Sequence, residues 1–345
     1  MAEKSTPIEI KRFHVCSWEF KDNSALMEFG CEIDATNCPE TRTLKLEMLI
    51  PWLQKSGNSV DLYEKIRDPL NSKFIFNDSV QNTEYLEGAS HNSGVIHTFY
   101  GRGKLCFLPL RISKDPEKKI LTIEVDLFSF TAQASGRKPN IYIRFYLEPE
   151  LSSISTRKTG ISKSTIIYDI KINEKRNLPD HLSTELRTKD LCKISSCFCF
   201  NIVPNNHELT FLDSASLKNV RTLEYNSFRK YLGDKRVKDN DLVVVFNKKD
   251  AAESYAFFSI YYKERIGAGQ FSFAILINIL TGILLYLPSL RTNSSSSMFS
   301  RAFLASIPME LYVAIGIGAS TFLYFFGPIG FVFLNNVLKK VGIKK

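Results

Sequence analysis

Aromatic and basic side chains alternate along a predicted strand at residues 141–147. Successive side chains of a strand point to opposite faces, so Tyr142, Arg144 and Tyr146 share one face. Aromatic rings stack on bases and a guanidinium pairs with phosphate, so this row can bind a nucleotide or a single-stranded oligonucleotide. The same pattern is also typical of a solvated sheet face, where tyrosine occurs for its strand propensity.

A second set of this kind lies upstream. Tyr100, Arg102 and Lys104 follow the same spacing of two, and Arg137 and Lys138 add charge in a predicted loop. We therefore expect a ligand site that draws on both sets. The candidate ligand-binding residues are Tyr142, Arg144, Tyr146, Tyr100, Arg102, Lys104, Arg137 and Lys138.

Signatures of catalysis and of metal binding are missing from the sequence. It has no phosphate-binding glycine loop of the Gly-x4-Gly-Lys-Ser/Thr type, no Gly-x-Ser-x-Gly and no His-Glu-x-x-His, and its five histidines are scattered. Cys197 and Cys199 alternate with phenylalanines, which places both thiols on one strand face as small core residues rather than zinc ligands. We predict a protein that is not an enzyme and needs no metal or cofactor.

Period-two segments dominate residues 1–265 and predict a domain built mostly of strands. Leu121, Ile123 and Val125 alternate with polar residues, as expected of an antiparallel sheet with one wet face. We predict an α+β fold with a mostly antiparallel, sandwich or barrel-like domain at 1–174 and a second α+β subdomain at 175–265. The expected strands are 8–20, 25–33, 43–53, 95–100, 104–112, 120–130, 141–147, 165–172, 195–203, 242–246 and 255–262, and the expected helices are 58–67 and 215–232.

Two long stretches near the C-terminus lack charged residues, at 266–290 and 311–338. A helix needs about 20 apolar residues to cross a bilayer, and buried helices of globular proteins are usually shorter. The sequence therefore predicts a C-terminal hairpin of two transmembrane helices, 266–290 and 309–338, rather than two core helices. The connecting loop is 291–308 and a basic tail follows at 339–345.

Charge predicts how this hairpin would be oriented. The chain has 45 basic and 36 acidic residues, but the first 266 residues are close to balance, with 39 against 35. Basic residues flank the predicted helices, which by the positive-inside rule puts both termini in the cytoplasm and the loop outside. The near balance of the first 266 residues argues against a duplex-DNA-binding protein.

Polar and small residues within the hairpin permit two interpretations. Asn278 and Glu310 could form rings that line a pore if several hairpins associate. Small residues at Ala314, Gly316, Gly318 and Ser320 favour close helix packing, which is equally typical of a simple anchor.

A β-rich cytoplasmic domain with the Tyr142/Arg144/Tyr146 row, followed by two membrane helices, resembles the membrane effectors of bacterial anti-phage systems of the CBASS and Hailong types. The resemblance implies a multi-pass protein of the bacterial inner membrane that assembles into a homo-oligomer, for which we expect a tetramer. It also implies a partner nucleotidyltransferase that supplies a nucleotide or oligonucleotide signal.

These observations predict an oligomeric membrane effector, an ion channel or membrane-disrupting protein in anti-phage defence, gated by a nucleotide or oligonucleotide bound to the cytoplasmic domain. The alternative is a membrane-anchored protein-interaction module that has no conductance.

Overall fold

A computed structural model describes residues 1–3, 8–37, 42–86, 94–133, 138–160, 163–176, 189–239, 241–249, 254–264, 268–292, 309, 312–320 and 323. The chain divides into two units. Unit 1 comprises Met1–Thr159 and Thr165–Lys263, and unit 2 comprises Gly160–Ser164 and Glu264–Lys345. The boundary expected near residue 174 does not separate two compact units, because strands from both sides of it belong to one sheet.

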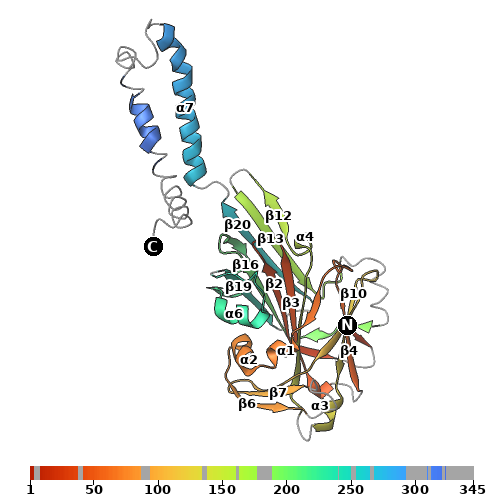
Figure 1. Cartoon of the computed structure of the whole chain (residues 1–345). Helices are drawn as coiled ribbons and strands as arrows, with labels where there is room; N and C mark the ends of the chain where they lie inside the picture. Colours follow the sequence, from red (N-terminus) through yellow and green to blue (C-terminus); the bar gives the residue numbers. More distant parts are fainter. Residues whose placement is uncertain are drawn as a thin grey trace. The chain divides into compact units, whose positions relative to one another are not determined.

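An eleven-stranded mixed sheet forms the centre of unit 1 (Figure 1). Its main path runs in the order β18-β19-β16-β2-β3-β11-β8-β7-β6, while β15 pairs with β2 and β5 pairs with β11. The strands are β2 (Glu9–Glu19), β3 (Ala25–Ile33), β5 (Ser59–Asp61), β6 (Val80–Tyr85), β7 (Val95–Phe99), β8 (Gly103–Phe107), β11 (Asn140–Leu147), β15 (Lys193–Ile194), β16 (Ser196–Val203), β18 (Leu217–Thr222) and β19 (Leu242–Lys249).

Three smaller sheets complete the strands of the described residues. They have the orders β4-β10-β9, β12-β13-β20-β17 and β1-β14. Their members are β1 (Ala2–Glu3), β4 (Thr43–Leu49), β9 (Leu110–Asp115), β10 (Ile120–Asp126), β12 (Thr156–Thr159), β13 (Lys163–Ile172), β14 (Lys189–Asp190), β17 (Glu208–Leu212) and β20 (Tyr255–Glu264).

Most strand pairs among the described residues are antiparallel, as predicted, but the central sheet is mixed. β16 pairs in parallel with β2, and β11 pairs in parallel with β8. A parallel pair needs a long connection, and β16 joins the sheet far along the chain from β2. Period-two alternation identifies a strand but carries no information about the direction of its neighbour.

The helices of unit 1 are short, and among them α2 has an N-cap residue whose side chain caps the first turn. They are α1 (Tyr63–Ile66), α2 (Pro69–Phe76), α3 (Phe128–Gln133), α4 (Leu151–Ile154) and α6 (Tyr225–Leu232), with a 3-10 turn at Ala35–Asn37. Asp68 accepts a hydrogen bond from the Leu70 backbone N–H (2.9 Å) and Pro69 is the first residue of α2, so a second helix begins directly after α1 ends. The helix expected at 58–67 is limited to 63–66, because 59–61 forms β5. Gly233 ends α6 in the left-handed conformation, as expected, but 217–222 forms a strand.

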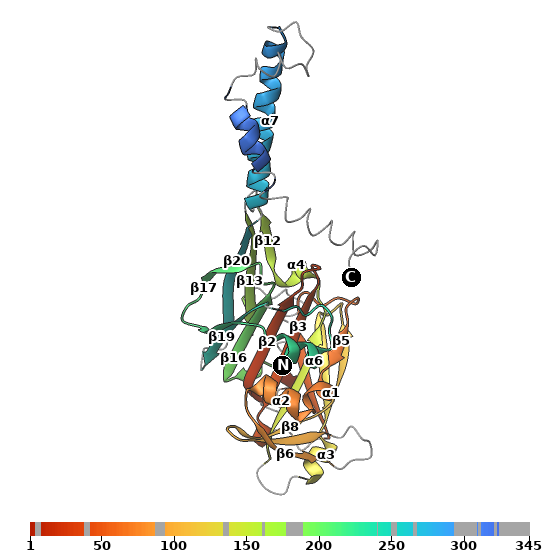
Figure 2. The same cartoon turned by 60° about the vertical axis from the view of Figure 1, so that its left-hand side comes forward.

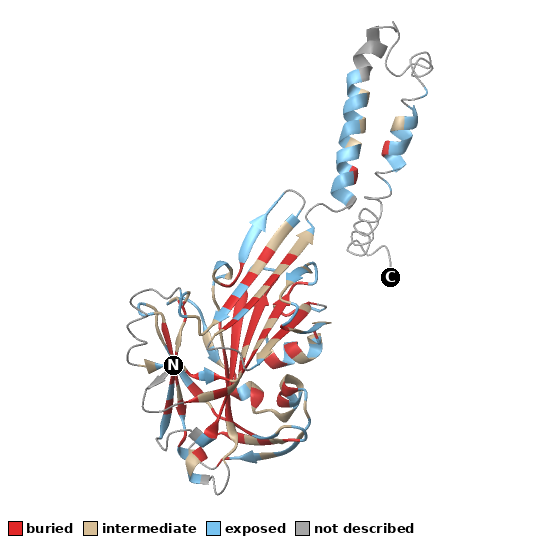
Figure 3. Cartoon of the chain, turned by 180° about the vertical axis from the view of Figure 1, so that it is seen from behind, coloured by how far each residue is buried: buried red, intermediate tan, exposed pale blue. Residues whose placement is uncertain are grey.

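Two hydrophobic cores lie on opposite faces of the central sheet. The first packs Phe13, Phe29 and Phe145 against the sheets of β4 and β13, and the second packs Trp18 and Tyr142 under α1, α2 and α6. Figure 2 shows α1, α2 and α6 on the same side of β2 and β3. Figure 3 shows buried residues along most of the length of the central strands. Because both faces are covered, the sheet has no fully wet face over most of β3 and β11.

Unit 2 contains α7 (Ala268–Thr292) and a helical stretch at 312–320. Within the part of the chain that the structure describes, no helix combines the length and the apolarity that crossing a membrane requires.

The prediction of a transmembrane hairpin at 266–290 and 309–338 is therefore wrong, and with it the ion channel and the multi-pass location in the bacterial inner membrane. The prediction relied on missing charges, and uncharged residues are not all apolar, since α7 carries Gln270, Ser272 and Asn278.

Candidate functional site

A chain of buried polar groups begins at Glu28 on β3. Arg144 and Tyr231 both donate to Oε1 of Glu28, and the Trp18 indole N–H donates to Oε2 at 3.3 Å. Arg144 also donates to the Tyr142 hydroxyl at 2.8 Å, and that hydroxyl lies 3.0 Å from Nδ1 of His14. The chain of contacts thus runs across the sheet from under α6 to β2.

Burial and charge act in opposite directions on these groups. Burial alone would lower the pKa of Arg144, but the Glu28 carboxylate holds that pKa well above its usual range. Burial raises the pKa of Tyr142 to about 12, so its hydroxyl stays protonated. Arg144 is therefore a buried cation with its own counterion, and not a free one.

Beyond His14 the same sheet face is only partly covered. We call the residues there the cationic-aromatic patch. Neighbouring strands of the sheet contribute most of it, and a turn contributes one cation. The patch consists of Arg12 and His14 on β2, Phe198 and Phe200 on β16, Lys218 on β18, and Arg102 in the turn between β7 and β8.

Register explains why these side chains meet. Phe198 is paired with His14 in the parallel ladder of β16 and β2. The His14 ring lies 5.3 Å from that of Phe198 and 6.1 Å from that of Phe200, and Lys218 Nζ lies 5.0 Å from the Phe198 centroid. Both phenylalanines are half-buried and Lys218 is exposed, so this edge of the patch is open to solvent.

Positive charge surrounds His14. Burial lowers the pKa of His14 well below its usual value, and Arg144, Arg12, Arg102 and Lys218 lower it further. An imidazole in this setting stays neutral at neutral pH, because a proton on it would face these four cations.

Arg102 is the least satisfied of these cations. Its guanidinium lies over the Phe76 ring at 4.7 Å and donates to the Phe76 carbonyl at 3.4 Å. Its Nε and NH1 atoms are buried and have no hydrogen-bond partner among the described residues, and Asp78 is 4.0 Å away. Buried hydrogen-bond donors normally have an acceptor, so this guanidinium can donate to an anionic ligand.

Two carboxylates lie beside the patch. Asp78 is 4.0 Å from Arg102 Nε. Glu32 accepts a hydrogen bond from the Asn140 amide at 2.9 Å, and its Oε2 lies 3.6 Å from Arg12 Nε. Arg12, Arg102 and Lys218 outnumber them. The patch is a net positive surface with aromatic rings beside it, which is the composition that binds phosphates and stacked bases.

The structure separates the sequence-predicted residues. Tyr142 and Arg144 share a face with Tyr146 as expected, but Tyr142 is fully buried and Arg144 is 7% exposed. Tyr100 is 79% exposed, and Lys104 pairs with Glu84 at 3.1 Å. The chain turns at 100–103, so these two do not line up with Arg102.

Arg102 connects the two predicted sets through Phe76. Its guanidinium lies over the Phe76 ring, and the Phe76 ring lies 4.9 Å from the ring of Tyr142. Lys138 is half-buried in the loop before β11, and Arg137 lies outside the described residues. Sequence reasoning missed Arg12, His14 and Lys218. The alternation of Arg12 and His14 along 8–20 was the available signal.

The predicted helix-packing and pore residues lie in unit 2. Gly318 is buried, and a Cβ there would be in ordinary van der Waals contact with the Ile279 side chain at 3.7 Å, so this position lies beside α7 but does not require glycine. Ala314 is half-buried, whereas Gly316 and Ser320 are exposed. Asn278 is exposed on α7, and Glu310 lies outside the described residues.

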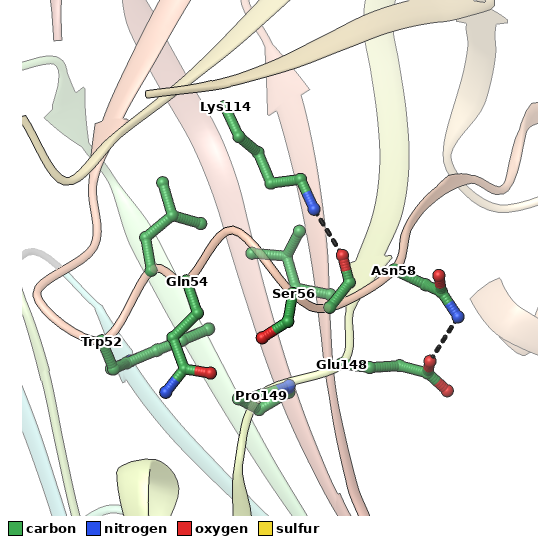
Figure 4. Close-up of a pocket in the computed structure, with 10 residues that line it drawn as sticks. Trp52, Gln54, Ser56, Asn58, Lys114, Glu148 and Pro149 are labelled. Atoms are coloured by element: carbon green, nitrogen blue, oxygen red, sulfur yellow. Dashed lines mark hydrogen bonds between the residues drawn. The ribbon is translucent and has the colours of Figure 1, made fainter. Parts of the chain in front are cut away.

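A small pocket lies on the other side of the sheet, between the loop at 52–58 and the end of β11 (Figure 4). Lys114 donates to the Gly57 carbonyl, and the Asn58 amide donates to Glu148 at 2.8 Å. Its volume of about 10 Å³ is room for one water molecule. We do not consider it a ligand site.

Cysteines and metal-binding groups add no further site. Cys197 and Cys199 are fully buried on β16, as the strand pattern predicted, and burial raises the pKa of both thiols. The described residues contain no cluster of histidine, cysteine and carboxylate side chains that could hold a metal ion.

Comparisons with known proteins do not identify a family. No family model matches the chain, and no curated protein matches it. Among solved structures, the Fcho1 Mu homology domain from Danio rerio, with bound Eps15 peptide, aligns over 77% of this chain and 82% of its own at 9% identity. The TM-score is 0.17, and a likeness of that size supports no argument about fold or function.

Proposed function

We propose that unit 1 is a binding module for a phosphate-bearing ligand, a nucleotide or short single-stranded oligonucleotide, held on the cationic-aromatic patch. One observation carries the proposal: the buried Nε and NH1 atoms of Arg102 have no hydrogen-bond partner among the described residues. A phosphate oxygen can accept from a free guanidinium N–H, and Arg12 and Lys218 add charge around His14. Phe198 and Phe200 offer ring faces for a base.

Charge removal tests the phosphate contact. The probe is a 5′-fluorescein-labelled tetraadenylate, followed by fluorescence anisotropy across a salt series. Arg102→Gln should weaken binding about tenfold or more, because a charge-assisted hydrogen bond is lost. The slope of log affinity against log salt should fall by about 0.7 for each phosphate contact removed.

Lys104→Gln is the matched control, because it removes the same charge from a residue paired with Glu84 outside the patch. It should leave the affinity within about twofold. An equal loss in both variants would mean general attraction of an anion to a basic surface, and would refute the patch. Absence of binding to the wild-type chain would refute it as well.

Stacking has its own test. Phe198→Leu keeps an apolar side chain but removes the ring, so tetraadenylate binding should weaken by about fivefold or more. Inorganic tripolyphosphate, used as an unlabelled competitor, should compete with the same potency in both proteins. If Phe198→Leu weakened tripolyphosphate binding as much as tetraadenylate binding, Phe198 would be positioning the cationic side chains and not stacking on a base.

A second candidate function concerns unit 2, which we propose as a self-association surface. Large apolar side chains are exposed on α7, including Phe271 (65%), Leu284 (56%) and Leu285 (76%). Exposed apolar surface of this extent marks an interaction site. Residues 268–290 carry no charge, so a second apolar α7 is a better match than a charged partner.

Sedimentation velocity of the full chain tests this. The double variant Phe271→Glu and Leu284→Glu should shift the protein to a smaller species, because two like charges would be buried in each contact. Val220→Glu adds a charge at an exposed apolar residue of unit 1 and should leave the distribution unchanged. An unchanged distribution in the double variant would refute self-association through α7.

A further inference from the structure

A cavity of about 290 Å³ opens on the face of the central sheet opposite the cationic-aromatic patch. Strands of three sheets contribute to it: β2, β4 and β13. Its apolar lining comprises Met1, Ile10, Phe13, Met48, Leu49, Pro51, Ile172, Leu191, Cys192 and Ile194.

A bulge in β2 builds the floor of this cavity. The register of β2 with β3 shifts between Ile10 and Arg12. Residues three apart on a regular strand point to opposite faces, yet Ile10 and Phe13 both belong to the same core. The bulge therefore turns Ile10 toward the side of the sheet that Phe13 already faces.

The charged side chains at the cavity rim form ion pairs. Glu47 pairs with Lys189, Glu174 pairs with Arg176 at 2.8 Å, and Lys171 pairs with Asp169 at 2.9 Å. The amino group of Met1 also lines the cavity and donates to the Glu47 carbonyl at 2.6 Å.

We infer that this cavity binds a small uncharged apolar molecule of about two rings. A dry apolar cavity of about 150 Å³ is large enough for benzene, so one of 290 Å³ holds roughly twice that size. Burying such a molecule against the apolar lining is favoured by the hydrophobic effect, whereas a charged group placed against that lining would lose its hydration. The inference does not depend on the phosphate site, because Phe13 and His14 point to opposite faces of β2.

Two dyes of the same ring system test the class of ligand. N-phenyl-1-naphthylamine is uncharged, and 8-anilinonaphthalene-1-sulfonate carries a sulfonate. The full chain should bind the uncharged dye with a rise in fluorescence, and should bind the sulfonate at least about tenfold more weakly. No binding of the uncharged dye, or equal affinity for both dyes, would overturn the inference.

Filling the cavity locates the dye. Ile172 and Met48 are only half-buried, so Ile172→Trp and Met48→Trp can add volume there with less disturbance than a change in the core. Each should weaken binding of the uncharged dye at least about tenfold, with an unfolding midpoint close to that of the wild type. Two variants keep the test valid if one of them fails to fold.

Leu284→Ala on α7 is the control for dye held by the exposed apolar side chains of unit 2. It should leave the affinity unchanged. Loss of binding in Leu284→Ala, with none in the two tryptophan variants, would place the dye on unit 2 and overturn the inference. Arg102→Gln should also leave dye binding unchanged, so that failure of the phosphate site and failure of the cavity are told apart.

Discussion

The hydroxyl of Tyr142 occupies the space in which a side chain on Gly30 would begin. Gly30 lies opposite His14 on β2 and opposite Arg144 on β11. Because Gly30 has no side chain, the Tyr142 hydroxyl can lie over β3 and reach both neighbours at once. This one contact joins the buried Glu28 network to the cationic-aromatic patch.

Gly30→Ala should therefore destabilise the protein by about 1–3 kcal/mol, because the added Cβ overlaps the Tyr142 hydroxyl and the core must shift. Urea unfolding measures the loss. In a Tyr142→Phe background the same change should cost less, since the overlapping oxygen is gone. An equal cost in both backgrounds would show that the hydroxyl does not set the requirement for glycine.

Removing the charge of Glu28 should be far more costly than removing a surface charge. Glu28→Gln keeps an acceptor oxygen but leaves the buried Arg144 without its counterion, at a cost of about 3–5 kcal/mol. Glu64→Gln breaks the exposed pair with Arg67 and should cost less than about 1 kcal/mol. Comparable losses in the two variants would contradict a buried ion pair.

The lowered pKa of His14 predicts a loss of stability in acid. Below about pH 6.5 the unfolded chain binds a proton at His14 that the folded chain does not, so stability falls as the pH decreases. His14→Gln removes this contribution. Urea unfolding at pH 7, 6 and 5 should show the wild type losing stability relative to the variant, by about 1 kcal/mol per pH unit below 6.5. A constant difference across this range would rule the effect out.

Protonation of Asp61 should change the folding stability with pH in the direction opposite to that of His14. Burial raises its pKa to about 6, although the N–H groups of Leu110 and Tyr63 donate to it and lower the pKa. The folded chain thus takes up this proton near pH 6 and the unfolded chain near 3.8, so stability contributed by Asp61 rises as the pH falls through 6. Measured from pH 7.5 to 5, the wild type should gain stability relative to Asp61→Asn. A relative loss would mean that the carboxylate is stabilised rather than penalised.

Much of the strand content was visible in the sequence. The alternation along 141–147 places Ile141, Ile143, Phe145 and Leu147 in one core and Tyr142 in the other, as the period of two requires. The start of α2 was misjudged, because Asp68-Pro69 fits the end of one helix as well as the beginning of another. The mixed pairing was missed, because no local pattern reports which distant strand lies alongside.

The candidate site was predicted only in part. Arg102, Tyr142 and Arg144 were singled out and lie close to the patch, but Tyr142 and Arg144 are buried rather than open to a ligand. Lys218 is absent from the prediction because 215–232 was expected to be helical, whereas Lys218 lies on strand β18. The three-sheet cavity was not predicted at all, since its lining comes from segments more than 100 residues apart.

By itself the sequence determined which side chains share a strand face and that charge is nearly balanced over the first 266 residues, because both follow from local geometry and composition. Only the tertiary structure decided that the aromatic-basic face of β11 is covered by α2 and α6, while the partly open face lies at β2, β16 and β18. The physical reason is that burial depends on what packs from elsewhere in the chain. A tyrosine-arginine row is identical in sequence whether water or a helix lies over it.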